Sequence, residues 1–78
     1  MSHVIQVGMR MLTCYGWQPA NSEVPPNAIA TTDADDSDSP AHYYLETEFP
    51  LLFSDADDAQ RTIDRFHIAD AKPIRWNR

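Results

Sequence analysis

The sequence predicts a small α+β domain, in which an antiparallel sheet of three or four strands carries one helix packed on one face. Three observations support this prediction. Apolar and polar residues alternate with period two along residues 5–17 and again along residues 42–53. Residues 55–67 repeat their apolar side chains at helical spacing, and a short partly apolar stretch, 72–76, follows them. The predicted order is strand, short strand, strand, helix, strand, within one domain that covers residues 1–78.

The first strand is predicted over about ten residues that begin at Ile5. Its odd-numbered positions, from Ile5 to Trp17, are mostly apolar and are expected to face the core. The even-numbered positions form a less apolar face, which includes Leu12 and Cys14. Gly8, within this strand, indicates a bulge or a close approach of another backbone.

Residues 18–41 are expected to form an irregular and mobile connection. Three prolines interrupt its first part, and residues 33–40 are almost entirely polar. Polar loop tips of this kind lie at the surface and move easily. Within the connection, residues 28–32 can form a short strand that pairs with 42–49 across the acidic stretch, which accounts for the fourth strand.

The next strand is predicted from residue 42, with Tyr43 and Leu45 among the residues on its inner face. Pro50 cannot donate a hydrogen bond to a neighbouring strand, so the strand either lies at an edge there or ends near Phe49. The opposite face of this strand is polar and carries His42, Tyr44, Glu46 and Glu48.

A helix is predicted from about Asp55 to about His67. Ser54 is a suitable N-cap, and Asp57 lies three residues later, at the acidic position of a capping box. Aspartates in the first turn are favoured by the helix dipole. A final strand over 72–76 follows the helix. The residues expected to face the core are Ala56, Ala59, Ile63 and Phe66 in the helix, and Ile74 and Trp76 in the last strand.

The net charge of −6 is concentrated in the middle of the chain. Residues 33–58 contain nine acidic side chains and no basic one, whereas residues 59–78 contain two acidic and five basic side chains. Such a distribution attracts basic partners and repels bare nucleic acid.

Features of targeting and redox environment predict a soluble, cytoplasmic protein with no membrane contact. The N-terminus has no basic region followed by an apolar run, so no secretory signal is expected. The apolar runs are far shorter than the ~20 residues of a membrane helix. Cys14 is the only cysteine, so no disulfide within the chain is possible, which fits a reducing compartment.

Known catalytic and metal-binding motifs do not fit this sequence. The acidic stretches that begin at Asp33 and Asp55 lack the central glycine and the terminal acid of a calcium-binding loop. The three histidines and the single cysteine do not have the spacing of a zinc site. No glycine-rich phosphate loop, nucleophile elbow or HExxH pattern is present. We therefore expect no enzymatic activity, no metal ion and no cofactor.

An acidic interaction surface is the remaining candidate for a functional site. Carboxylates from three stretches are expected to form one negative zone if the fold brings them together, and such a zone could occupy the basic groove of a nucleic-acid-binding protein. The simpler interpretation is that these acids keep a small protein soluble and cap its helix. The predicted partner-binding residues are Asp33, Asp35, Asp36, Asp38, Tyr44, Glu46, Glu48, Asp55, Asp57 and Asp58.

In its small size, its acidic character and the stretches DADDSD and SDADDAQ, the chain resembles the small inhibitors that bacteriophages encode, including anti-CRISPR proteins, several of which mimic DNA. The resemblance implies an inhibitor that works in the host cytoplasm and docks its negative face on a basic surface of a CRISPR–Cas or other nucleic-acid-binding complex.

Two other functions follow from the sequence. One is a self-associating structural or regulatory module, since the first strand offers apolar side chains for a homodimer surface. These side chains are Met9, Met11, Tyr15 and Trp17. The other is nucleic-acid binding through the basic C-terminal segment, which is disfavoured because its five bases form no continuous stripe.

Overall fold

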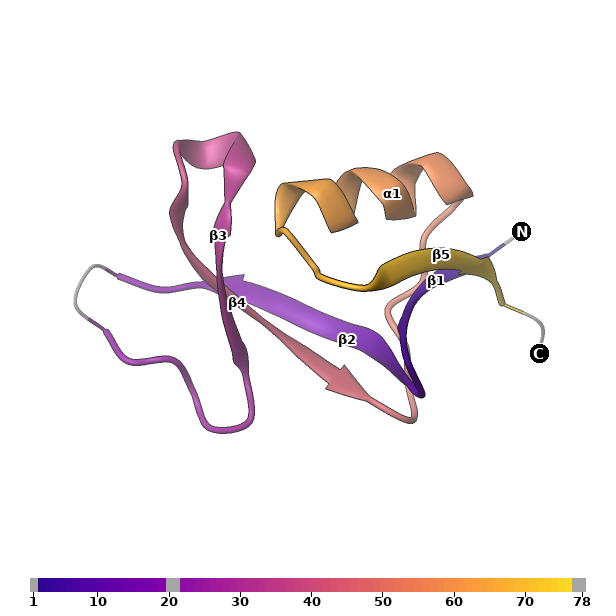
Figure 1. Ribbon diagram of the computed structural model, residues 1–78, viewed down its shortest axis with the longest axis horizontal. Helices are drawn as coiled ribbons and strands as arrows, with labels where there is room; N and C mark the ends of the chain where they lie inside the picture. The colour runs from indigo at the N-terminus through magenta and orange to yellow at the C-terminus, as the bar shows by residue number, and fades with distance from the viewer. Residues whose placement is uncertain (1, 20–21, 77–78) are drawn as a thin grey trace.

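The computed structural model describes residues 2–19 and 22–76, and within these residues the chain forms one five-stranded sheet and one α-helix (Figure 1). The sheet order is β3-β4-β2-β1-β5, and every neighbouring pair is antiparallel. The predicted α+β class is confirmed, with one strand more than expected. The elements are β1 (His3–Val7), β2 (Arg10–Trp17), β3 (Ile29–Asp33), a short 3₁₀ helix η1 (Ala34–Asp36), β4 (Ser39–Glu46), α1 (Ala56–Arg65) and β5 (Ala71–Arg75).

The additional strand arises because the predicted first strand is a hairpin. Gly8 and Met9 form a two-residue turn between the paired residues Val7 and Arg10. Gly8 has a φ of +62°, which glycine adopts without steric cost, and glycine at the first turn position is typical of a type II′ hairpin. The bulge or close approach predicted at Gly8 is therefore wrong, since no atom lies within 4 Å of where its Cβ would be. Met9, expected on the buried face, is 92% exposed.

The hairpin turn and a bulge in β2 together determine which side chains of β2 face the core. The register against β4 shifts between Leu12 and Cys14, so that Leu12 lies opposite Leu45 and Cys14 lies opposite Tyr44. An extra residue in one strand turns the following side chains to the other face of the sheet. Leu12 precedes the bulge and is fully buried, although the alternation placed it on the less apolar face, because the hairpin pairs odd positions of β1 with even positions of β2. The bulge after Leu12 returns odd-numbered Tyr15 to the core side.

The predicted short strand at 28–32 is confirmed as β3, which pairs with β4 across the acidic stretch. Tyr43 on β4 is buried, as the alternation predicts. β4 ends at Glu46, before the expected end near Phe49, whose φ of 57° cannot continue a strand. The connection 18–41 was expected to be irregular, but it contains β3, η1 and the start of β4; its mobility stays a prediction.

The helix begins and ends slightly inside its predicted bounds. Asp55, not Ser54, is the N-cap of α1, and its Oδ1 accepts a hydrogen bond of 2.7 Å from the backbone N–H of Asp58. Asp57 therefore does not complete the predicted capping box. The helix ends at Arg65, and Phe66 is the C-cap, whose N–H donates to the carbonyl of Thr62.

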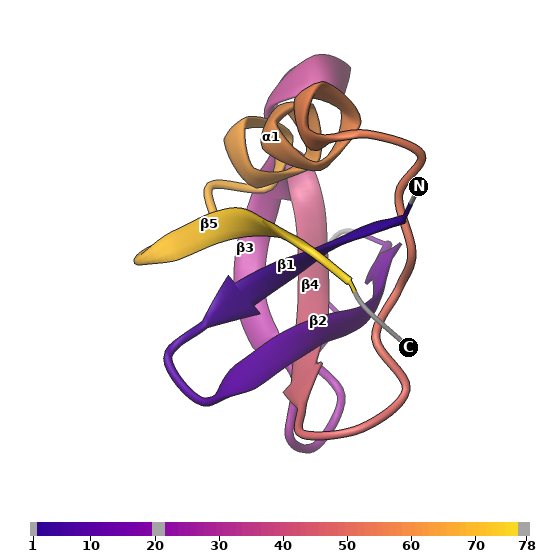
Figure 2. The same ribbon diagram turned by 90° about the vertical axis from the view of Figure 1, so that its right-hand side faces the viewer.

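α1 lies across one face of the sheet, next to β1 and β5 (Figures 1 and 2). Ala59, Ile63 and Phe66 are buried as predicted, whereas Ala56 is exposed. With them, the core contains Ile5, Leu12, Ala41, Tyr43, Phe53 and Ile68. In the last strand, Ile74 is only partly buried, and Trp76 lies just beyond the end of β5.

Two parts of the predictions fall outside the described residues. They are residues 20–21 of the expected mobile connection and Arg78 of the basic C-terminal segment.

Candidate interaction surface

Among the predicted site residues, Asp33 has the most hydrogen-bond partners, and it lies inside the protein. Its side chain is 0% exposed. Arg65 donates from Nε to Oδ1 at 2.7 Å and from Nη2 to Oδ2 at 2.8 Å. The indole N–H of Trp17 donates to Oδ2 at 2.6 Å, and the backbone N–H of Asp35 donates to Oδ1 at 2.9 Å. Asp33 therefore lies inside the protein and not on the exposed acidic surface where the sequence pattern placed it.

The guanidinium of Arg65 is also held by aromatic rings. Its central carbon lies 5.5 Å from the centroid of the Trp17 ring and 5.1 Å from that of Phe66. Its Nε lies 3.5 Å from a carboxylate oxygen of Asp35. Stacking on rings and paired hydrogen bonds use the two properties that distinguish arginine from lysine. The cluster fastens η1 to the C-terminal end of α1, where the two helices lie side by side in Figure 1.

These contacts lower the pKa of Asp33. The pKa of Asp33 falls from 3.8 to about 2. The hydrogen bonds from Arg65 are the largest cause, and the donors of Trp17 and Asp35 act in the same direction, whereas burial acts in the opposite one. Donors that bond to a carboxylate favour its charged form. Asp33 thus stays ionised in the folded protein well below the pH at which an unfolded chain would protonate it.

We expect the free energy of unfolding to fall as the pH falls from about 4 to about 2. The pKa of Asp33 is lower in the folded protein than in the unfolded chain, so its contribution is present above the unfolded value and is lost as pH falls through the folded value. Urea unfolding followed by tryptophan fluorescence, at pH steps from about 6 to about 2, measures the effect. Asp33→Asn should reduce the slope of the free energy of unfolding against pH in this range. An unchanged slope in the variant would contradict the lowered pKa of Asp33.

The remaining predicted acids lie in three separate places. Residues 35–38 are at η1, beside the C-terminal end of α1, whereas residues 55–58 are at its N-terminal end, about 15 Å away along the helix. Glu46 and Glu48 lie at and just beyond the end of β4, at the opposite end of the molecule from η1 in both views (Figures 1 and 2). The fold does not join the three stretches into the single negative zone that was expected.

Several of these carboxylates are engaged within the chain. Asp58 lies 3.3 Å from Nη2 of Arg61, and Asp36 accepts a hydrogen bond of 2.9 Å from the Ser39 hydroxyl. Asp55 caps the helix. Glu46, Glu48, Asp38 and Asp57 are exposed, and none of these carboxylates has a hydrogen bond or an ion pair with any residue that the structure describes. Glu46 and Glu48 differ from the other two because they border a hollow that also has exposed apolar side chains.

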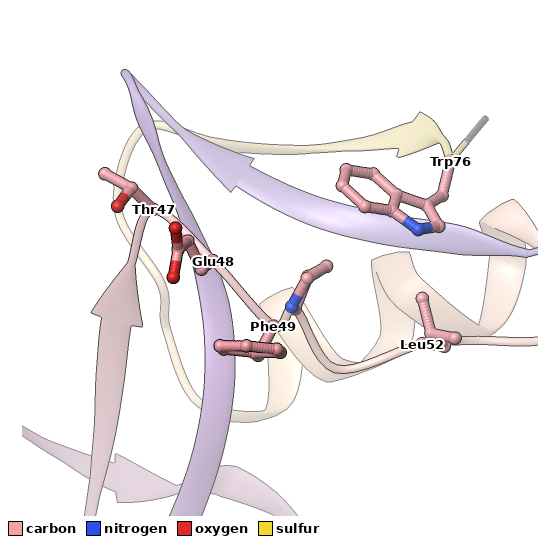
Figure 3. A pocket seen from close by; sticks show the side chains of 6 residues that line it. Thr47, Glu48, Phe49, Leu52 and Trp76 are labelled. Atoms are coloured by element: carbon pink, nitrogen blue, oxygen red, sulfur yellow. The ribbon is translucent and has the colours of Figure 1, made fainter. Parts of the chain in front are cut away.

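A shallow hollow lies where the chain leaves β4 (Figure 3). Its volume is about 530 Å³, and an adjoining hollow of about 290 Å³ also borders Glu46 and Thr13. In Figure 3, Glu48 and Phe49 lie on one side of the hollow, and Leu52 and Trp76 lie on the other. The residues that line the first hollow are Thr47, Glu48, Phe49, Pro50, Leu52 and Trp76.

Phe49 is the most unusual residue of this hollow. Its side chain is 85% exposed, and its backbone has a φ of 57°. A bulky residue at positive φ is strained by roughly 1–2 kcal/mol, and backbone strain of this kind clusters at functional sites. Leu52, on the other side of the hollow, is 52% exposed. The loop after β4 thus presents apolar side chains to solvent beside Glu48.

Three predicted partner-binding residues do lie together here. Tyr44 and Glu46 are two residues apart on β4 and therefore face the same side of the sheet, and Glu48 follows in the loop. The Tyr44 ring meets the ring of His42 edge-on, with centroids 5.7 Å apart. Nδ1 of His42 in turn lies 2.9 Å from Oε1 of Gln18. We call the group the β4-end surface; it comprises Tyr44, Glu46, Glu48, Phe49, Leu52 and Trp76.

The sequence patterns missed the apolar half of this surface. Period-two alternation placed Phe49 and Trp76 on inner faces. Pro50 was the one signal that the alternation stops near this point, because proline cannot continue a strand ladder. It did not show that Phe49 would turn outward.

Comparison with known proteins adds nothing to these observations, since no protein-family model, no curated protein and no solved structure matches the chain. The fold alone defines it as a small α+β domain. None of the helices formed by residues 2–19 and 22–76 is long and apolar enough to span a bilayer. In the same residues, no three side chains of His, Cys, Asp or Glu are grouped as a metal site requires.

Proposed function

We propose that this chain is a non-enzymatic interaction protein that docks its β4-end surface on a basic surface of a partner protein. The observation that carries the proposal is the pairing of two carboxylates that have no partner among the described residues, Glu46 and Glu48, with the exposed ring of Phe49. Aromatic side chains are enriched among the residues that contribute most to protein–protein affinity. Complementary charge around them speeds association and selects the partner.

The partner class we favour is a nucleic-acid-binding protein of a host cell, which makes the chain a phage-type inhibitor similar in kind to anti-CRISPR proteins. Nucleic-acid-binding proteins present dense lysine and arginine side chains to phosphates. A chain with a net charge of −6, and with two acids at one end that form no ion pair with the described residues, is complementary to such a groove. By occupying the groove it would exclude nucleic acid without any chemical step.

The alternative homodimer surface has less support. Tyr15 packs against Phe66 with ring centroids 4.5 Å apart, and Trp17 donates its indole N–H to Asp33. Met9 lies in the β1–β2 turn, apart from both. The four apolar residues named for this surface therefore do not form one exposed face.

Charge reversal at the β4-end surface is expected to abolish docking. The double variant Glu46→Lys/Glu48→Lys places like charges against a basic partner, so we expect its affinity to fall by about 100-fold or more. The tagged chain is used to capture its partner from host lysate, and the purified pair is then titrated by calorimetry. For the unmodified chain, the affinity should also fall steeply between low and high salt.

The matched control is Asp36→Lys/Asp38→Lys, which makes the same change of net charge at η1. We expect this control to bind the partner with nearly the affinity of the unmodified chain. Equal losses in the two double variants, or binding that does not respond to salt, would count against the proposal.

A further inference from the structure

We infer that the β4-end surface recognises an arginine side chain of its partner, with the guanidinium between the Glu48 carboxylate and the rings of Phe49 and Trp76. This inference rests on the proposed function, because it names the chemical group that the surface accepts.

The protein already contains one guanidinium site, and its composition shows what such a site requires. Arg65 forms two hydrogen bonds, of 2.7 and 2.8 Å, with the carboxylate of Asp33. Two aromatic rings, of Trp17 and Phe66, lie 5.5 and 5.1 Å from its central carbon. A carboxylate provides the paired acceptors, and the rings provide flat apolar faces for the planar cation.

The hollow after β4 assembles the same groups at the surface. It has one carboxylate, Glu48, and two aromatic side chains, Phe49 and Trp76, around a volume of about 530 Å³ (Figure 3). No described residue forms an ion pair with Glu48. The carboxylate of Glu46, which borders the adjoining hollow, adds negative charge next to the same position. A cation from another molecule complements these groups in both charge and shape.

Arginine fits this arrangement better than lysine does. Its guanidinium is planar and weakly hydrated, so it can stack on a ring and bond a carboxylate at the same time. A lysine ammonium is a compact and strongly hydrated charge, which loses more hydration when it leaves water and cannot stack as a plane. The basic partner should therefore contribute an arginine to the centre of the interface.

A peptide titration of the full chain tests the inference. The ¹⁵N-labelled protein is titrated with three blocked tripeptides, Ala-Arg-Ala, Ala-Lys-Ala and Ala-citrulline-Ala, and followed by NMR. The arginine peptide should shift the backbone signals of Glu48 and Phe49 and the indole N–H signal of Trp76. We expect the lysine peptide to bind about five-fold more weakly and the neutral citrulline peptide to show no saturable shift.

Exposed residues allow matched variants that leave the core intact. Phe49→Ala and Glu48→Gln should each lower the affinity for the arginine peptide by about ten-fold. Their controls are Met9→Ala, which removes an exposed apolar side chain in the β1–β2 turn, and Glu23→Gln, which neutralises an exposed acid in the connection before β3. Both controls should bind as the unmodified chain does.

Two results would overturn the inference: equal shifts with the citrulline peptide, or arginine-induced shifts that map to residues 35–38 or 55–58. The proposed function is tested separately by the captured partner. A partner that is lost with Glu46→Lys/Glu48→Lys but retained with Phe49→Ala would remove the arginine site and leave the acidic docking surface standing. Arginine-peptide binding at Glu48 and Phe49, without any partner whose binding depends on charge, would keep the arginine site and remove the proposed docking function.

Discussion

Asp33→Ala is expected to lower the melting temperature by about 15 °C or more. The substitution removes the acceptor of four hydrogen bonds and leaves the guanidinium of Arg65 without its main counter-charge. Removing one partner of a buried ion pair is strongly destabilising, because the other charge is left without compensation. The Arg65 side chain is 33% exposed, so its charge would stay partly removed from water. The loss should also detach η1 from α1. Thermal unfolding followed by circular dichroism measures the change.

Two further variants separate the ion pair from a general effect of removing an acid. Asp36→Ala removes an exposed carboxylate of the same acidic stretch and should leave the melting temperature nearly unchanged. Asp33→Asn/Arg65→Met should be more stable than Asp33→Asn alone, since the double variant buries no unpaired charge. A melting temperature for Asp33→Ala close to that of the unmodified chain would show that the pair does not hold the fold.

Phe66→Ala is expected to lower the free energy of unfolding by about 3–5 kcal/mol. The side chain of Phe66 is 0% exposed, and its ring lies 4.5 Å from that of Tyr15 and 5.9 Å from that of Trp17, between centroids. Its loss leaves a cavity under the C-terminal end of α1. Domains of this size are stable by only about 5–15 kcal/mol in total, so the variant should be close to unfolded at room temperature.

Chemical denaturation at neutral pH measures this loss, and the chain contains its own matched control. Phe49→Ala removes the same atoms from a side chain that is 85% exposed, so its effect should stay within about 0.5 kcal/mol. If Phe66→Ala cannot be obtained folded, Phe66→Leu should show a smaller loss in the same direction. Similar losses for the two alanine variants would contradict the placement of Phe66 in the core.

Structural features that depend only on residues close in sequence were predicted correctly. The inner face of β4 and the buried stripe of α1 follow directly from periods of two and 3.6 residues, which are local properties of the backbone. Tyr43, Ile63 and Phe66 are buried for this reason. The pairing of β3 with β4 could also be predicted, because the two stretches are adjacent in sequence and separated by a polar turn.

The first hairpin was not recognised because two exchanges of faces cancel each other. A loop of two residues pairs odd positions of β1 with even positions of β2, as Val7 with Arg10, so even-numbered Leu12 faces the core. The bulge between Leu12 and Cys14 returns odd positions to the core side, so the alternation of the sequence looks like that of one continuous strand. A bulge depends on how β2 meets β4, and nothing in the sequence of β2 alone marks it.

The predicted site residues lie together only where they are close in the sequence. Tyr44, Glu46 and Glu48 follow one another along β4 and its loop, and they stay together in the fold. Asp33 was grouped with the solvated acids around it, but its partner Arg65 lies 32 positions away. Contacts over such distances leave no local signature, so the sequence could not distinguish an internal carboxylate from an exposed one.

The pairing of β1 with β5 bears on how the protein is made. β1 lies between β2 and β5, with His3 opposite Arg75, so one edge of β1 has no partner until residues 71–75 leave the ribosome (Figure 2). At about 5–20 residues per second, this lasts for several seconds, during which the nascent chain can pair with other chains and benefits most from a chaperone. Once β5 has paired, it becomes an edge of the sheet, and Pro73 and Lys72 make this edge a poor template for a further strand.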